Sequence, residues 1–258
     1  MPKNASVQEI QSFYDEEASR YYSTRYIGDS ADSVVWRSRA DVVLELTGDV
    51  GGVVVDLGCG PGVLAPRLVR QAGRVISADL SWEMLRVGRD NLGLGQDAHW
   101  INCDLSHLPF ATGSVEALLV IGVYGLVEDR AGVLHEFARV VQPGGRLIIQ
   151  TPNAWSPRKL VEKGTRRLRL SRREAYENRL ATHGIDPRPL RSAEFAQMLR
   201  TAGFVPRRRR YYDFRLPFLS RLGARTDART AAVLHRLLHR RPVLGQLGEG
   251  LVLEAERR

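Results

Sequence analysis

Three aspartates stand at the ends of short apolar runs, and their types and positions most clearly predict chemistry. Asp56 follows three valines, Asp79 ends a second run, and Asp104 follows a third. Short apolar runs are typical of buried parallel strands, and in open α/β sheets ligands bind at the carboxyl ends of the strands. A carboxylate there attracts a cation and accepts hydrogen bonds from a vicinal diol. The pattern predicts a ligand that carries both a positive charge and a vicinal diol.

The loop after Asp56 narrows the choice of ligand. Its glycines are Gly58, Gly60 and Gly62, with Cys59 between the first two. Dinucleotide-binding loops have the spacing G-x-G-x-x-G, which places a pyrophosphate on a helix N-terminus. The spacing here is G-x-G-x-G, and an acid two residues before the first glycine suits a cationic ligand better than a phosphate. For the loop alone, a strand-turn-helix without a ligand is the alternative.

The segment 56–62, Asp-Leu-Gly-Cys-Gly-Pro-Gly, resembles the first motif of the class I S-adenosylmethionine (SAM)-dependent methyltransferases. The Asp-Leu-Ser at 79–81 and the Pro-Gly-Gly at 143–145 are also close to that family, and the resemblance is strongest over residues 50–152. It points to the small-molecule branch, which includes the ubiquinone and menaquinone methyltransferases. The resemblance implies a biosynthetic methyltransferase with SAM as its cofactor.

The resemblance also implies roles for particular residues. In this family an acid after the second strand binds the ribose, and an acid after the third strand, with the next backbone group, binds adenine. An aromatic residue from an N-terminal helix often covers the cofactor, although packing of that helix on the domain is the alternative for both tyrosines named here. The expected cofactor-binding residues are Tyr14, Tyr22, Asp56, Gly58, Cys59, Gly60, Gly62, Asp79, Leu80, Asp104, Leu105 and Ile121.

Catalysis by such a protein requires alignment of the acceptor, the methyl group and the sulfur, and it requires a base only for a weakly acidic acceptor such as a hydroxyl. Glu128, Asp129 and His107 are candidate bases, as is His183, and Tyr124 is a candidate for positioning the acceptor. A surface loop position is the alternative for His107. The N/D-P-P-Y/F tetrad of enzymes that methylate base amines is absent, and no spacing indicates a metal site.

Charge bears on the acceptor and on partners. The net charge is +9, and its cations are concentrated after residue 155. Basic segments with apolar stripes suit a small or lipid-like acceptor of anionic character, and O-methylation is the commonest outcome in such relatives. A compositional preference for arginine is the alternative, since only three of the 38 cations are lysines. A non-catalytic scaffold or regulatory protein and an RNA methyltransferase are the other functions considered, although no nucleic-acid recognition module is evident.

The elements that position these residues follow from the alternation of strand and helix signals. They predict an α/β fold, a doubly wound Rossmann-like sheet of seven mostly parallel strands with an antiparallel last strand. The expected parts are an N-terminal helical cap (1–46), the SAM-binding core (47–153), a basic lid insertion after the fifth strand (154–190) and the rest of the sheet with a basic amphipathic helical insertion (191–258).

Helix caps, an apolar stripe and the two cysteines give further expectations. Ser33, Ser81 and Ser192 are expected to cap helices. An apolar stripe in the last insertion (Val233, Leu234, Leu237 and Leu238) has core packing and peripheral membrane contact as alternatives. The two cysteines, Cys59 and Cys103, indicate no disulfide framework, so a cytoplasmic setting, or one peripheral at the membrane, is expected.

Overall fold

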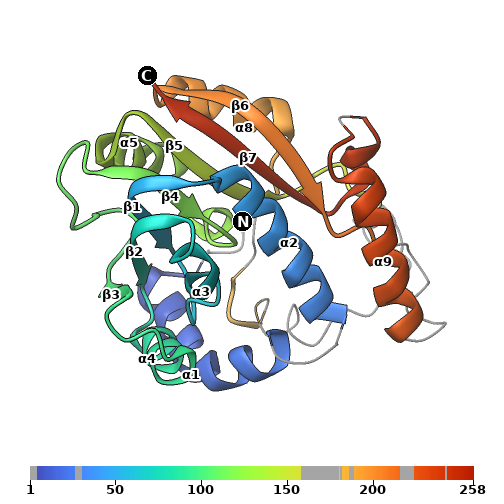
Figure 1. Ribbon diagram of the computed structural model, residues 1–258, viewed down its shortest axis with the longest axis horizontal. Helices are drawn as coiled ribbons and strands as arrows, with labels where there is room; N and C mark the ends of the chain where they lie inside the picture. Colours follow the sequence, from blue (N-terminus) through green and yellow to red (C-terminus); the bar gives the residue numbers. More distant parts are fainter. Residues whose placement is uncertain are drawn as a thin grey trace.

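The computed structural model describes residues 5–26, 31–157, 180, 182–185, 189–215, 224–241 and 243–258. Within them, seven strands form one sheet in the order β3-β2-β1-β4-β5-β7-β6 (Figure 1). The first five are parallel, and β7 lies antiparallel between β5 and β6. The predicted fold is confirmed. The strands are β1 (Val50–Leu57), β2 (Ala72–Asp79), β3 (Ala98–Asn102), β4 (Val115–Val120), β5 (Val141–Pro152), β6 (Phe204–Tyr212) and β7 (Gly250–Arg257).

Helices cover both faces of the sheet. Alternate residues of the central strands point to opposite faces, so that Leu118 packs in one core cluster and Leu119 in the other. One cluster is completed by α5 and α8, and the other by α2 and α3. The main helices are α1 (Val7–Arg25), α2 (Ala31–Thr47), α3 (Ala65–Leu68), α4 (Trp82–Leu92), α5 (Arg130–Val140), α8 (Ser192–Thr201) and α9 (Ala224–Leu238), and the short 3₁₀ helices are η1 (Tyr124–Leu126) and η3 (Leu244–Leu247).

Two of the outer helices pack on other helices of the fold. α1 packs against α4, and α9 packs alongside α2 (Figure 1). α1 begins with a capping box in which Ser6 accepts a hydrogen bond from the backbone N–H of Glu9. α4 begins at the predicted cap, because the Ser81 hydroxyl accepts from the Met84 N–H at 3.1 Å. In the described part of the chain, no helix combines the length and the apolar character needed to cross a membrane.

Two predicted caps are wrong. α2 already begins at Ala31, so Ser33 lies inside the helix, where it is buried. Ser192 is the first residue of α8, and the N-cap is Arg191, which makes no side-chain capping bond. The chain is still extended at Leu190, which forms a parallel bridge with Asn153, so that Arg191 takes the N-cap position of α8. The sequence Gly28-Asp29-Ser30 also predicts a break between the first two helices, and that break and most of the predicted lid fall outside the described residues.

Candidate active site

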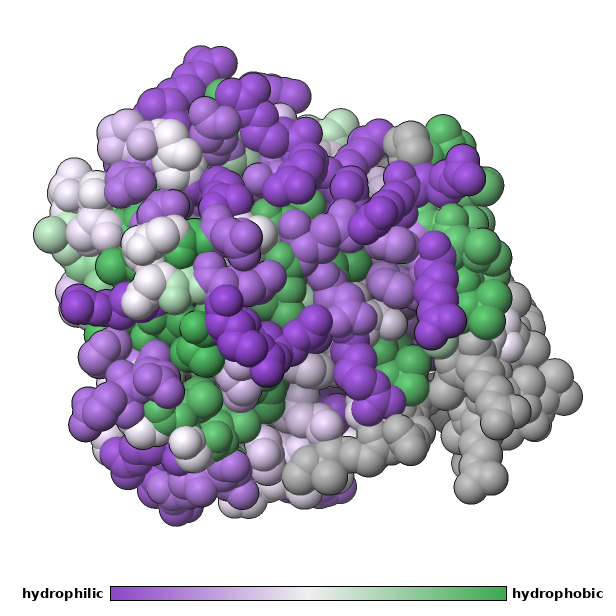
Figure 2. Space-filling model, in the orientation of Figure 1, coloured by the Kyte–Doolittle hydropathy of each residue, from purple (hydrophilic) through white to green (hydrophobic). Residues whose placement is uncertain are grey.

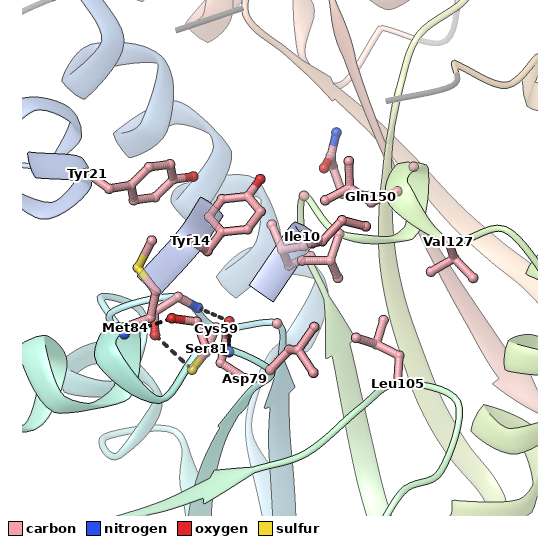
Figure 3. Close-up of a pocket in the computed structure, with 18 of the residues that line it drawn as sticks. Ile10, Tyr14, Tyr21, Cys59, Asp79, Ser81, Met84, Leu105, Val127 and Gln150 are labelled. Atoms are coloured by element: carbon pink, nitrogen blue, oxygen red, sulfur yellow. Dashed lines mark hydrogen bonds between the residues drawn. The ribbon is translucent and has the colours of Figure 1, made fainter. Parts of the chain in front are cut away.

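A cavity of about 590 Å³ opens at the carboxyl ends of the parallel strands. Its floor is the end of β1 with the glycine loop, the ends of β2 and β4 and the loop after β3, and α1 and α2 form its other walls. Tyr14 and Tyr21 of α1 lie on one side, across from Cys59 and Asp79, and Gln150 lies further along (Figure 3). The volume is in the range of small-molecule sites.

The glycine loop holds a shape that other residues would not permit. Gly58 and Gly62 have φ values of 69° and 61°. A Cβ on Gly58 would lie 2.4 Å from Val123 Cγ1, and one on Gly62 would lie 2.6 Å from the Trp100 ring. Gly58 lines the pocket, whereas Gly62 packs behind the loop. The loop therefore needs its glycines both for backbone conformation and for close approach of its neighbours.

Asp79 is fixed by the backbone around it. One carboxylate oxygen accepts from the Gly60 N–H at 2.7 Å, and the other accepts from the Ser81 N–H at 2.9 Å. Burial raises the pKa of Asp79 to about 6, and these two hydrogen bonds oppose the rise. Asp15 of α1 lies close by, where it accepts from the Ser81 hydroxyl at 2.5 Å. Asp79 is thus held in place with acceptor capacity left for a ligand.

Asp56 lies deeper than Asp79. It is buried, and burial together with the nearby charge of Asp79 raises its pKa to about 7. The positive charge of Arg39 opposes this rise. A buried and a half-buried carboxylate whose pKa values are both raised make a place where a cationic ligand would be stabilised.

Arg39 of α2 is a pocket residue that the sequence prediction missed. Its Nη1 atom lies 3.4 Å from the position a Cβ would occupy on Gly122, just past β4. Tyr21, Tyr26 and Tyr212 surround it, and all of them line the pocket. Burial would raise the pKa of Tyr21, but the guanidinium groups of Arg25 and Arg39 lower it. No local pattern in the sequence marks this group, because Arg39 comes from α2, Tyr21 and Tyr26 from α1 and its C-cap, and Tyr212 from β6.

Gln150 is the second missed residue. It lies on β5, is buried and lines the pocket, and its Oε1 atom has no hydrogen-bond partner. A buried amide oxygen without a protein partner costs free energy unless water or a ligand donates to it, so Gln150 offers the cavity a hydrogen-bond acceptor. The sequence predicted Gln150 as part of a strand and gave no reason to single it out.

The Asp104 loop is fastened from the side of α5. Glu136 accepts from the Leu108 N–H at 2.8 Å, and the Arg139 guanidinium donates to the carbonyls of Leu108 and Phe110. Arg139 and Glu136 also pair with each other at 2.7 Å. This pair holds the segment that follows Asp104 against the domain.

Most of the predicted site residues meet in this pocket. Of the twelve residues expected at the cofactor, ten line it, including all three aspartates, and the exceptions are Tyr22 and Gly62. The side chain that lines the pocket from the end of α1 is Tyr21 rather than Tyr22. Glu128 and Asp129 also line it, and Asp129 in addition accepts from the Gly132 N–H as the N-cap of α5.

The other catalytic candidates lie elsewhere. Tyr124 is fully buried, stacks on Phe195 and donates its hydroxyl to the Arg130 carbonyl, so it does not line the pocket. The reason is that η1 turns its ring into the core behind β4. His107 and His183 do not line the pocket either. This geometry does not support acceptor contacts by any of these three residues.

Part of the chain is similar in sequence to known proteins. Residues 55–149 match the family model of a methyltransferase domain. A demethylmenaquinone methyltransferase of Clavibacter sepedonicus is 31% identical over 161 residues, which cover 60% of this chain and 62% of that protein. The chain thus spans less than two thirds of the length of that relative.

Among the solved structures with the same fold, two match this chain over nearly its full length. The magnesium protoporphyrin IX methyltransferase of Synechocystis PCC 6803, solved with bound SAH, has a TM-score of 0.68 at 14% identity and covers 98% of this chain and 100% of that one. The geranyl diphosphate C-methyltransferase of Streptomyces coelicolor A3(2) has a TM-score of 0.64 at 16% identity and covers 100% of both chains. At such identities the likeness concerns the fold.

Proposed function

We propose that this chain transfers the methyl group of SAM to a small or lipid-like acceptor, a proposal supported by the match of residues 55–149 to the family model of a methyltransferase domain. One observation carries the proposal: Asp56, Asp79 and Asp104 line a single pocket beside the glycine loop. Acids at neighbouring strand ends suit a ligand with a diol and a positive charge, and SAM has both.

The pocket residues fit SAM group by group. Asp79 would hold the ribose hydroxyls, and Asp104 the adenine amine. Asp56 would stabilise the ammonium group, and Arg39 beside it would pair with the carboxylate, since a guanidinium binds a carboxylate through two hydrogen bonds. When bound, SAM supplies a methyl group on a positively charged sulfur that leaves readily. The protein's part is to align the acceptor with that methyl group and to exclude water.

The acceptor is proposed to lie beyond the strand ends, near Gln150. The wall there includes Leu126 and Val127, which are apolar, and the Gln150 amide oxygen would accept a hydrogen bond from an acceptor hydroxyl. Glu128 lines the same cavity and is the preferred candidate base, because Asp129 already caps α5. These features support O-methylation of an apolar, hydroxyl-bearing acceptor.

Transfer to carbon is the second candidate. The relative from Clavibacter is named for demethylmenaquinone, and one solved structure with the same fold is named a C-methyltransferase. Removal of a proton from a ring hydroxyl would also activate a neighbouring ring carbon, so the same pocket residues serve both outcomes.

A labelling experiment tests the proposal. The chain is incubated with methyl-labelled SAM and an organic extract of cells, and the label is expected in one extracted compound. Magnetic resonance of that product separates an O-methyl from a C-methyl group. Label found only in added RNA would favour an RNA methyltransferase. If the chain binds no SAM in calorimetry and labels nothing, the scaffold alternative replaces the proposal.

Binding of SAM is expected to release protons near neutral pH. The raised pKa values of Asp56 and Asp79 mean that unliganded chains hold protons at pH 6, and a cation beside the carboxylates lowers those values. Binding at pH 6 should therefore release about one proton and binding at pH 8 almost none, and affinity should rise between them. Calorimetry in two buffers of different ionisation enthalpy measures the release. Asp56→Asn should remove most of it; unchanged release in that variant would contradict the assignment.

A further inference from the structure

Apolar side chains are exposed together on one side of the molecule. In the described residues, eight large apolar side chains are exposed, and six of them come from two nearby segments. Figure 2 shows apolar residues gathered over α9 and the turn that follows it, at the right-hand edge, with hydrophilic residues among them. We call these six residues the α9 patch: Trp155, Val233, Leu237, Val243, Leu244 and Leu247.

The patch is one surface because hydrogen bonds join its parts. Val233 and Leu237 are one turn apart on α9, and η3 follows directly, with the Gly245 N–H donating to the Arg241 carbonyl at 2.8 Å. The Asn153 side chain donates to the carbonyls of Gln246 and Gly248 at 2.8 and 2.7 Å. The Trp155 N–H in turn donates to Asn153 Oδ1. The tryptophan is therefore tied beside η3.

The predicted stripe on α9 divides into two faces. Leu234 and Leu238 pack against the core, so core packing is the correct alternative for these two residues. Val233 is 55% exposed and Leu237 is 63% exposed, so core packing does not explain them. An amphipathic helix that already packs one face has no internal need for leucine and valine on the other.

Charge decides which partner fits. Arg236 and Arg241 are exposed beside the patch, as is Arg240, which pairs with Glu45 of α2 at 3.2 Å, and the segment 230–248 contains no acidic residue. The Arg191 guanidinium lies 5.3 Å from the centre of the Trp155 ring, which adds a further cation. Exposed apolar side chains with a tryptophan and a rim of arginines match the boundary between the headgroups and acyl chains of an anionic bilayer.

We propose that the α9 patch docks the protein on the surface of an anionic lipid bilayer. The patch also adjoins the pocket, because Glu249 and Gly250, which line the pocket, follow Leu247 by two and three residues. Docking would bring the acceptor end of the pocket to the membrane. The purpose of docking rests on the proposed function, since an apolar acceptor resides in lipid, but binding to a bilayer is measured without cofactor or acceptor.

Vesicle sedimentation of the full chain tests the proposal. Binding is expected to vesicles of phosphatidylcholine with roughly one third phosphatidylglycerol and to be far weaker to phosphatidylcholine alone, with a steep loss on added salt. Trp155→Glu is expected to weaken binding about tenfold, and Leu237→Glu combined with Leu244→Glu at least as much. Heats of SAM binding should be unchanged in these variants, which also shows that they fold.

A matched control is Trp82→Glu. Trp82 is exposed to a similar extent, 51% against 54% for Trp155, but lies on α4 outside the patch. Its replacement should leave vesicle binding unchanged. The proposal is overturned if the wild-type chain does not sediment with the mixed vesicles, if both tryptophan variants behave alike, or if Leu237→Glu merely converts a dimer to a monomer. Failure of SAM binding with intact vesicle binding would overturn the proposed function alone.

Discussion

Asp79→Ala is expected to weaken SAM binding by about 100-fold or more. Two charge-assisted hydrogen bonds to the ribose would be lost, each contributing about 1.5–3 kcal/mol. The Gly60 and Ser81 N–H groups would also lose their acceptor, so the glycine loop would no longer be fixed. Isothermal calorimetry with SAM and with its demethylated product, S-adenosylhomocysteine, measures the loss.

Asp79→Asn separates the two effects of that change. An asparagine keeps one oxygen that accepts a backbone N–H, so it preserves part of the loop, but it carries no charge. Its affinity for SAM should lie between those of the wild type and Asp79→Ala. Thermal unfolding checks that each variant is folded. Affinity within threefold of wild type in both folded variants would show that this acid does not hold the ligand.

Arg39→Leu is expected to weaken binding of S-adenosylhomocysteine by roughly 30-fold or more. A buried guanidinium paired with a carboxylate contributes two charge-assisted hydrogen bonds, and leucine replaces neither. The loss should be specific, because Arg39 lies at the end of β4 near Asp56 and not at the Asp79 or Asp104 end of the pocket. Calorimetry at pH 8 avoids the titration of the two buried acids.

Methylthioadenosine is the matched ligand for this test. It has the adenine, the ribose and the sulfur but neither the carboxylate nor the ammonium group. Wild type and Arg39→Leu should bind it equally, whereas they should differ for S-adenosylhomocysteine. Equal losses for both ligands would mean that Arg39 supports the pocket as a whole. Arg39→Lys, which keeps the charge but not the paired geometry, should recover only part of the affinity.

The sequence was most informative where one segment sets its own geometry. Apolar runs ended by Asp56 and Asp79 are local signals, and the parallel sheet then brings their ends together. Ser81 was predicted as a cap from its own position, and it is one. Ser33 and Ser192 failed as caps because the extent of a helix depends on what packs around its first turn, which local sequence does not record.

The sequence was least informative where side chains from distant elements meet. Arg39 and Tyr212 are 173 positions apart, and nothing local marks either as a pocket residue. Tyr21 rather than Tyr22 lines the pocket, a difference of one helical position, about 100° around the axis, that depends on how α1 docks on α4. Tyr124 had the right sequence position for an acceptor contact, but η1 turns it into the core.

The raised pKa values of Asp56 and Asp79 also have a consequence for the lifetime of the protein. Folded chains hold the protons of Asp56 and Asp79 more tightly than unfolded chains do, so the free energy of unfolding falls as pH rises from about 4 to 7. At neutral pH the empty protein bears most of this cost, and a bound cation would remove it. Proteases degrade chains from opened states, so if SAM is the bound cation, as proposed, a cell short of SAM would clear this protein faster than a well-supplied one.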